Sequence, residues 1–230
     1  MFKWFSGSGE DVSGMERMRC VFGQMLDEGR HVFVSAANAF LGGTEISVIR
    51  EDLFDTDKRI NHAEQQIRRE IVVHTTVHGV NSVPECLVLM SIVKDAERVG
   101  DYAKNIFDLA ELTPKPASGK FKEDLVELKD RISNLMVACR EVFDLQDEDA
   151  AKELIVEAEA IEDHCDSKIS KLVSEDKNRD LSASYALAYR YFKRVTSHSL
   201  NVLTSIVQPL DKLDYSLQNV ESGQNVESGA

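Results

Sequence analysis

Two carboxylates stand four residues apart near the middle of the chain, in the stretch Asp95-Ala-Glu97-Arg-Val-Gly-Asp101. On an α-helix, side chains at this spacing share one face at about 5–6 Å. Carboxylate oxygens so placed form half of a site for a hard or borderline cation. Gly100, inside the same stretch, costs a helix about 1 kcal/mol relative to alanine. Close approach of another helix, or room for a bulky ligand, would explain that glycine.

A second interpretation of the same stretch needs no ligand. Lys94 and Lys104 flank the acidic pair, three residues outside it on either side. A lysine within one turn of each carboxylate is typical of a solvated charge ladder on a helix surface. The residue types therefore leave a cation site and a ladder of ion pairs open as alternatives.

Histidines offer two further metal patterns. His74 and His78 have the spacing of zinc-binding helices, but no Glu follows His74, and His78 adjoins Gly79, where a helix dipole alone favours histidine. Glu28 and His31 have the Glu-x-x-His spacing of di-iron bundles, which require a second such pair on another helix. The sequence has no second pair, so the pair Glu97 and Asp101 remains the best metal candidate.

Catalytic motifs do not occur in the sequence. It has no Gly-x-Ser-x-Gly nucleophile elbow, no Gly-x-x-x-x-Gly-Lys phosphate loop and no Gly-x-Gly-x-x-Gly dinucleotide loop. We therefore predict that the protein is not an enzyme. A metal-binding regulatory adaptor and a metal-independent helical scaffold are the two hypotheses that remain.

Long helices must position these residues, because apolar side chains recur every three or four residues. The first helix shows the pattern between Met15 and Phe40, at Met15, Met18, Phe22, Met25, Val32, Ala36 and Phe40. Five further segments have the same period, from Thr44 to Gly79, Ser82 to Ala110, Phe121 to Val142, Asp147 to Leu172 and Ser182 to Pro209. No alternating strand pattern bounded by turns occurs, so we predict an all-α protein.

Turn and capping residues define the ends of these segments. Gly42 and Gly43 end the first helix, and Thr44 is the expected N-cap of the second. Gly79 stops the second helix, and the capping box Ser82-x-x-Glu85, with Pro84 in the first turn, begins the third. Each boundary is therefore assigned to a residue with a physical reason to be there.

An internal repeat groups the six helices into two bundles. A shift of 96 residues superposes the apolar stripe of the third helix on that of the sixth. Positions 96, 99, 103, 106 and 110 fall on Phe192, Val195, Ser199, Val202 and Ile206. Two prolines and a glycine between Thr113 and Gly119 mark the break between the halves. We therefore predict two tandem three-helix bundles, at residues 12–113 and 120–217, with a linker at 114–119, an aromatic segment at 1–11 and a disordered tail at 218–230.

Composition limits the compartment and the partners. The formal net charge of −13 argues against nucleic acid as a partner, because phosphate binding needs a basic surface. No run of 18 apolar residues and no secretory leader is recognisable, so we expect a cytoplasmic protein. The four scattered cysteines, Cys20, Cys86, Cys139 and Cys165, are expected to be buried small hydrophobes rather than a disulfide framework.

The stretch from Ile92 to Ile106 resembles the signature of the PhoU family of phosphate-transport regulators. The resemblance rests on the sequence Glu97-Arg-Val-Gly-Asp101 and on the Ala and Asn105 that follow it. The tandem three-helix plan is similar to that of the family over about residues 12–216.

The resemblance implies a site and a set of partners. Members bind metal clusters through the paired acids, so Glu97 and Asp101 would be ligands and Asn105 a nearby polar partner, for a divalent or transition metal such as Fe, Zn, Mn or Mg. Further candidates lie on the second helix, namely Asp57, Asn61 and Glu64. The family implies docking on the cytoplasmic component of a phosphate transporter or its sensor kinase, peripheral membrane association through that partner, and a homodimer as one assembly.

The second half departs from the family pattern. The repeat places Lys193 where Glu97 stands and Ser197 where Asp101 stands, and a Lys–Ser pair is no anionic half-site. Glu162 and Asp166 on the fifth helix and His198 on the sixth are the substitute ligands that the sequence offers. We therefore expect the second bundle to bind metal weakly or not at all.

Overall fold

The structure is a computed structural model that describes residues 12–113, 118–174 and 179–213. The described residues form six long helices and no strand, so the all-α prediction is confirmed. The helices are α1 (Val12–Phe40), α2 (Ile46–His78), α3 (Val83–Leu112), α4 (Gly119–Leu145), α5 (Glu148–Ser174) and α6 (Arg179–Val207), with the 3-10 turns η1 (Val80–Ser82) and η2 (Leu210–Lys212). The aromatic segment at residues 1–11, residues 114–117 of the linker and the tail at 218–230 lie outside the described residues.

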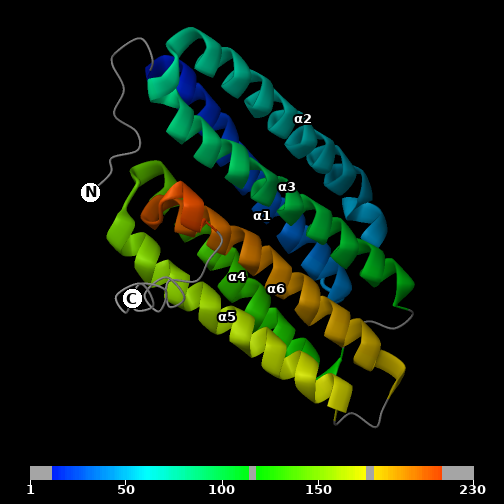
Figure 1. Cartoon of the computed structure of the whole chain (residues 1–230). Coiled ribbons are helices and arrows are strands. Elements are labelled where there is room, and N and C mark those ends of the chain that lie inside the picture. Colours follow the sequence, from blue (N-terminus) through cyan, green and yellow to red (C-terminus); the bar gives the residue numbers. More distant parts are fainter. Residues whose placement is uncertain (1–11, 114–117, 175–178, 214–230) are drawn as a thin grey trace, which may run out of the picture.

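Four helices form the centre of the molecule, and the other two flank it. Within the described chain, α1 packs against α3 and α4, and α6 packs against the same two helices, which closes a four-helix ring. Helix α2 packs on α1 and α3, and α5 packs on α4 and α6. Figure 1 shows this arrangement: the helices run side by side along one direction, and α2 and α5 lie on opposite sides of the bundle.

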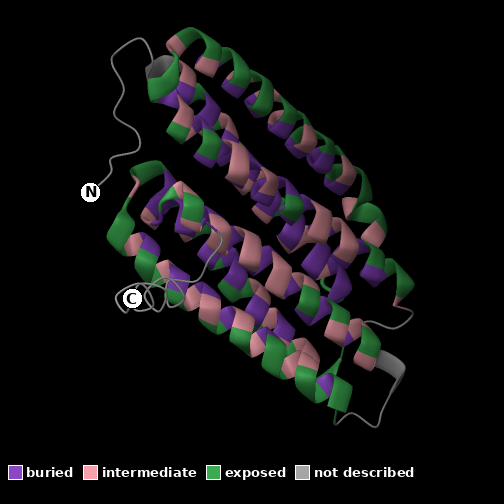
Figure 2. Cartoon of the chain, in the orientation of Figure 1, coloured by how far each residue is buried: buried purple, intermediate pink, exposed green. Residues whose placement is uncertain are grey.

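The apolar interior runs through both halves. Buried hydrophobic side chains from all six helices form one continuous cluster, and Figure 2 shows the buried residues along the central helices and the exposed ones along the outer faces of α2 and α5. The repeat stripe is confirmed, because all ten of its positions on α3 and α6 are buried. The division into two bundles at residues 114–119 stays a prediction.

Most helix ends lie where the sequence predicts them. Gly79 has a φ of 74°, a conformation that favours glycine, and caps the C-terminus of α2. The Asp147 carboxylate accepts hydrogen bonds from the backbone N–H groups of Asp149 and Ala150, both at 3.1 Å, and so caps α5. Pro84 occupies the first turn of α3.

Two capping predictions are wrong. The N-cap of α2 is Glu45 and not Thr44, and it makes no side-chain capping bond. Ser82 is the N-cap of α3 but forms no capping box, because its hydroxyl donates to the carbonyl of Gly79 at 2.9 Å instead. The turn η1 places Ser82 in a helical conformation, which directs its side chain backward rather than into α3.

The cysteine prediction holds for three of the four residues. Cys86, Cys139 and Cys165 are buried free thiols, and burial raises the pKa of Cys139 and Cys165 to about 12. Cys20 is exposed, which corrects the expectation that it is buried. None of the described helices is long and apolar enough to cross a lipid bilayer.

Candidate functional site on α2 and α3

The acidic pair of α3 faces α2. Glu97 is buried and Asp101 is partly buried one turn further along, with Asn105 partly buried in the next turn. Gly100 also faces α2, where an added Cβ would lie 3.4 Å from Asp57 Oδ1 and 3.5 Å from Ile60 Cδ1, both ordinary contact distances. These distances leave room for a methyl group, so close helix approach does not account for Gly100.

Two pairs of carboxylates lie on the face between α2 and α3. In the first pair, Lys104 forms ion pairs with both Asp57 of α2 and Asp101 of α3. Lys104 Nζ lies 2.9 Å from Asp57 Oδ1 and 3.0 Å from Asp101 Oδ1, and Asn61 donates to Asp57 Oδ2 at 3.2 Å. Burial alone would lower the pKa of Lys104, but its hydrogen bonds to Asp57 and Asp101 outweigh burial and raise the pKa above its ordinary value. The ammonium group therefore stays charged at neutral pH.

The second carboxylate pair joins Glu64 of α2 to Glu97 of α3 through Lys94. Lys94 Nζ lies 2.6 Å from Glu97 Oε2 and 3.8 Å from Glu64 Oε1. An Arg68 nitrogen lies 2.9 Å from the same Glu64 oxygen. The structure thus brings the predicted residues of the two helices together as two acid pairs, each with a lysine between its members.

The donor chemistry of this face suits a divalent cation, because carboxylate and amide oxygens are the ligands that hard cations prefer. The geometry does not fit a metal cluster as the side chains stand. In the part of the chain that the structure describes, no group of three or more His, Cys, Asp or Glu side chains is arranged to hold a metal ion. Metal binding by Glu97, Asp101 and Asn105 therefore stays a prediction.

The corresponding face of the second half pairs differently. Glu162 of α5 accepts a hydrogen bond from the Ser197 hydroxyl, and Asp166 forms an ion pair with Lys193. The acids of α5 therefore contact the two α6 residues that the repeat assigns to the positions of Asp101 and Glu97. No carboxylate of α6 faces them at these positions.

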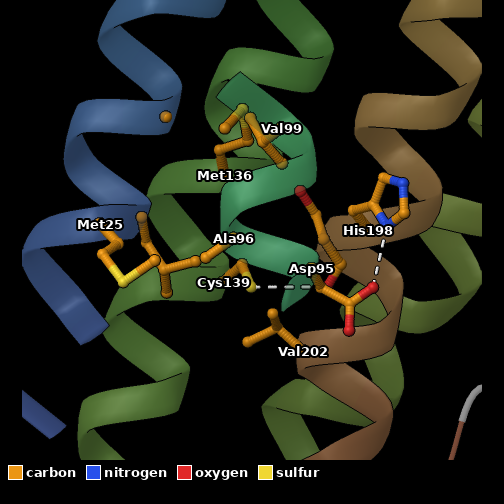
Figure 3. Close-up of a pocket in the computed structure, with 11 residues that line it drawn as sticks. Met25, Asp95, Ala96, Val99, Met136, Cys139, His198 and Val202 are labelled. Carbon is orange, nitrogen blue, oxygen red and sulfur yellow. Dashed lines mark hydrogen bonds and ion pairs between the residues drawn. The ribbon is translucent and has the colours of Figure 1, made fainter. Parts of the chain in front are cut away.

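His198 lies away from the α5 acids and contacts α3 instead. Its Nδ1 is 2.8 Å from Asp95 Oδ1, and the Asn201 amide donates to the same oxygen at 2.8 Å. The Tyr102 ring stacks on the imidazole, with ring centroids 5.6 Å apart. Figure 3 shows Asp95 and His198 reaching toward each other from the two helices. The contact of Asp95 with His198 was not predicted from the sequence. The repeat that relates α3 to α6 was the one signal that linked the two helices.

The cavity beside this contact is too small for a substrate. Its volume is about 10 Å³, which is room for roughly one water molecule. The side chains around it are mostly apolar, among them Met25, Ala96, Val99, Met136 and Val202. The Asp95–His198 contact therefore ties the two halves together at a closed interface.

A second polar cluster joins α4, α5 and α6. It was not predicted from the sequence. The Asp124 carboxylate is 3.0 Å from His164 Nε2, accepts the Tyr189 hydroxyl at 2.6 Å and forms an ion pair with Lys168. Burial alone would raise the pKa of Asp124, but hydrogen bonds from these three partners outweigh it and lower the pKa. Burial, and then the bond to Asp124, raises the pKa of Tyr189. The cluster anchors the second half.

The remaining histidine patterns serve local contacts. Glu28 accepts from Arg59 at 2.7 Å, and His31 Nε2 lies 2.6 Å from an Asp52 oxygen, so the two side chains engage different partners. The rings of His74 and His78 lie on one face of α2 with centroids 4.3 Å apart.

Comparison with known proteins points to one family. Residues 22–110 match the family model of the PhoU domain. The solved structure of the phosphate transport system regulatory protein PhoU from Streptococcus pneumoniae is similar, with a TM-score of 0.72 and 16% identity over 87% of this chain and 95% of that chain. PhoU from Pseudomonas aeruginosa is similar with a TM-score of 0.66 and 16% identity over 86% and 93% of the two chains. No curated protein gives a match.

Proposed function

Because residues 22–110 match the family model of the PhoU domain, we propose that this protein is a PhoU-like regulator of phosphate transport. The match of the domain is the observation that carries the proposal, and the PhoU fold along 87% of the chain supports it. The similar pneumococcal protein is a regulatory protein of a phosphate transport system, and the role proposed for this chain is likewise regulatory and not enzymatic. The proposal also covers the docking partner, the cellular compartment and the binding of a metal, which are taken up below.

Regulation by docking is the mechanism that we favour. The interior of the described bundle is a continuous cluster of apolar side chains, so we assign regulation to its surface. The outer face of α2 instead ends in three exposed valines, Val72, Val73 and Val77, which are 61–69% exposed. Exposed apolar side chains gathered on one face are typical of interaction surfaces.

The proposed partner is the cytoplasmic component of a phosphate transporter, and its sensor kinase is the second candidate. Both follow from the resemblance to PhoU proteins, as do a cytoplasmic location, peripheral association with the membrane through the partner, and a homodimer. Metal binding by Glu97 and Asp101 stays a prediction, and docking through α2 does not require it.

The docking step is tested with the purified full chain and the purified cytoplasmic subunit of the transporter. We expect saturable binding by calorimetry, and we expect Val73→Asp with Val77→Asp to weaken it by about tenfold or more, because a charge in the contact removes apolar burial. The matched control is Val156→Asp on the outer face of α5, where an exposed valine (64%) stands without such neighbours.

Three outcomes are informative. Binding that is lost in the α2 variant and kept in the α5 variant supports docking through α2. Binding to the sensor kinase alone supports the second partner. No binding to either partner contradicts the docking proposal and favours a helical scaffold with another partner.

A further inference from the structure

We propose that Lys94 and Lys104 are the resident cations of the face between α2 and α3, so that a divalent cation binds there only by displacing a lysine ammonium group. Each lysine lies between a carboxylate of α2 and a carboxylate of α3. The inference goes beyond the proposed function and does not depend on it, because it concerns the charges of the isolated protein.

Each of the two ammonium groups lies within 4 Å of both carboxylates of its pair, in the space that a bridging cation would need. Lys104 Nζ is about equally far from Asp57 and Asp101, at 2.9 and 3.0 Å. Lys94 Nζ contacts Glu97 at 2.6 Å and lies 3.8 Å from Glu64. A lysine ammonium is a compact point charge with three donors, so it can serve two carboxylates at once.

The charges of the face already cancel. Its four carboxylates belong to Asp57, Glu64, Glu97 and Asp101. Four cationic side chains lie within 4 Å of them, those of Arg68, Lys94, Arg98 and Lys104. If all four cationic side chains stayed in place, they would repel a divalent ion at the same short distances at which the four carboxylates attract it. Displacement of a lysine is therefore a condition for binding.

Burial makes the lysines necessary. The side chains of Glu64 and Glu97 are only 9% exposed, and a buried carboxylate without a counter-ion is strongly unfavourable. Removal of the lysines would leave pairs of carboxylates that need a new cation. The prediction is thus that the loss of Lys94 and Lys104 converts this face into a cation site.

The test measures Mn²⁺ binding to the full chain by calorimetry, after treatment with a chelator and dialysis. We expect the wild-type chain to bind Mn²⁺ weakly and the variant Lys94→Met with Lys104→Met to bind it about tenfold tighter or more. Lys58→Met is the matched control, because Lys58 pairs with Asp55 on the same helix at 2.8 Å and bridges no second acid. It should leave the affinity unchanged.

Further variants keep the proposal open to contradiction. Adding Glu97→Gln and Asp101→Asn to the double lysine variant should remove the gain in affinity. If the double lysine variant does not fold, Lys104→Met alone is measured by thermal unfolding in Mn²⁺, where we expect a larger rise in Tm than for the wild-type chain. The proposal is overturned if the lysine variants bind Mn²⁺ no tighter than wild type, or if Mn²⁺ raises the Tm of wild type as much as that of Lys104→Met.

Discussion

The face between α2 and α3 and the face between α5 and α6 share one helix plan and differ in charge. In the first half, carboxylates of both helices meet across two lysines. In the second half, the acids Glu162 and Asp166 meet Ser197 and Lys193 of α6. The apolar stripes of α3 and α6 are buried at the same repeat positions. The core therefore keeps the fold, while the polar face between the outer and inner helices is free to change.

The difference also shows how each half satisfies its charges. The first half keeps four carboxylates by surrounding them with four cations, whereas the second half replaces one acid by a hydroxyl and the other by a lysine. The second half holds its strongest polar cluster elsewhere, at Asp124. A charged face between α2 and α3 is thus a property of the first half and not of the repeat.

Exchanging the charges of the two halves should have the largest effect. We expect Glu97→Lys to lower the free energy of unfolding by roughly 3 kcal/mol, because it places a second cation beside Lys94 in a site where the glutamate is 9% exposed. The converse change, Lys193→Glu, should cost only about 1 kcal/mol, since its partner Asp166 is 53% exposed. Urea denaturation measures both.

Glu51→Lys, at an exposed position of α2, is the control for a change of net charge alone. Equal losses in Glu97→Lys and Lys193→Glu would contradict the difference in burial between the two faces.

Asp124 of the second half and Lys104 of the first half should respond to opposite ends of the pH scale. The pKa of Asp124 is lowered by its partners, so its stabilisation is present above the unfolded pKa of about 4 and is lost as pH falls through the folded pKa. The pKa of Lys104 is raised, so its stabilisation is present below the unfolded pKa of about 10.4 and is lost as pH rises through the folded pKa.

Urea unfolding as a function of pH checks both limbs. Asp124→Asn should flatten the acid limb, and Lys104→Met should flatten the alkaline limb. If the free energy of unfolding depended on pH in the same way in wild type and in both variants, neither Asp124 nor Lys104 would govern the pH dependence of stability.

The smallest effect is expected at Gly100. Its added Cβ would stand 3.4 Å from Asp57 Oδ1, an ordinary contact distance, while alanine favours a helix over glycine. We therefore expect Gly100→Ala to raise the free energy of unfolding by about 0.5–1 kcal/mol. A loss of stability in thermal or urea unfolding would show that α2 and α3 approach too closely for any side chain here.

Much of the fold could be predicted from the sequence because it depends on periodicity. The spacing of apolar residues locates six helices. Gly79 ends α2 and Asp147 caps the start of α5, each through its own backbone or side chain. Thr44 fails as a cap because α2 begins after Glu45, and Ser82 makes no capping bond because its backbone is helical and its hydroxyl donates to Gly79. Capping depends on a dihedral angle that residue type does not determine.

The candidate site could be predicted only in part. Spacing places Glu97 and Asp101 on one face and Lys94 and Lys104 beside them. It does not show that Asp57 and Glu64 of α2 share those lysines, because that depends on the register of two helices. The contact of Asp95 with His198 is hidden for the same reason.

Deletion of the gene tests most directly the proposal that this protein regulates phosphate transport. In phosphate-rich medium we expect the deletion strain to derepress phosphate-starvation genes or to change its rate of phosphate uptake, and we expect the wild-type chain to restore both. Wild-type uptake, polyphosphate stores and starvation-gene expression in the deletion strain, with no paralogue to compensate, would contradict the claim.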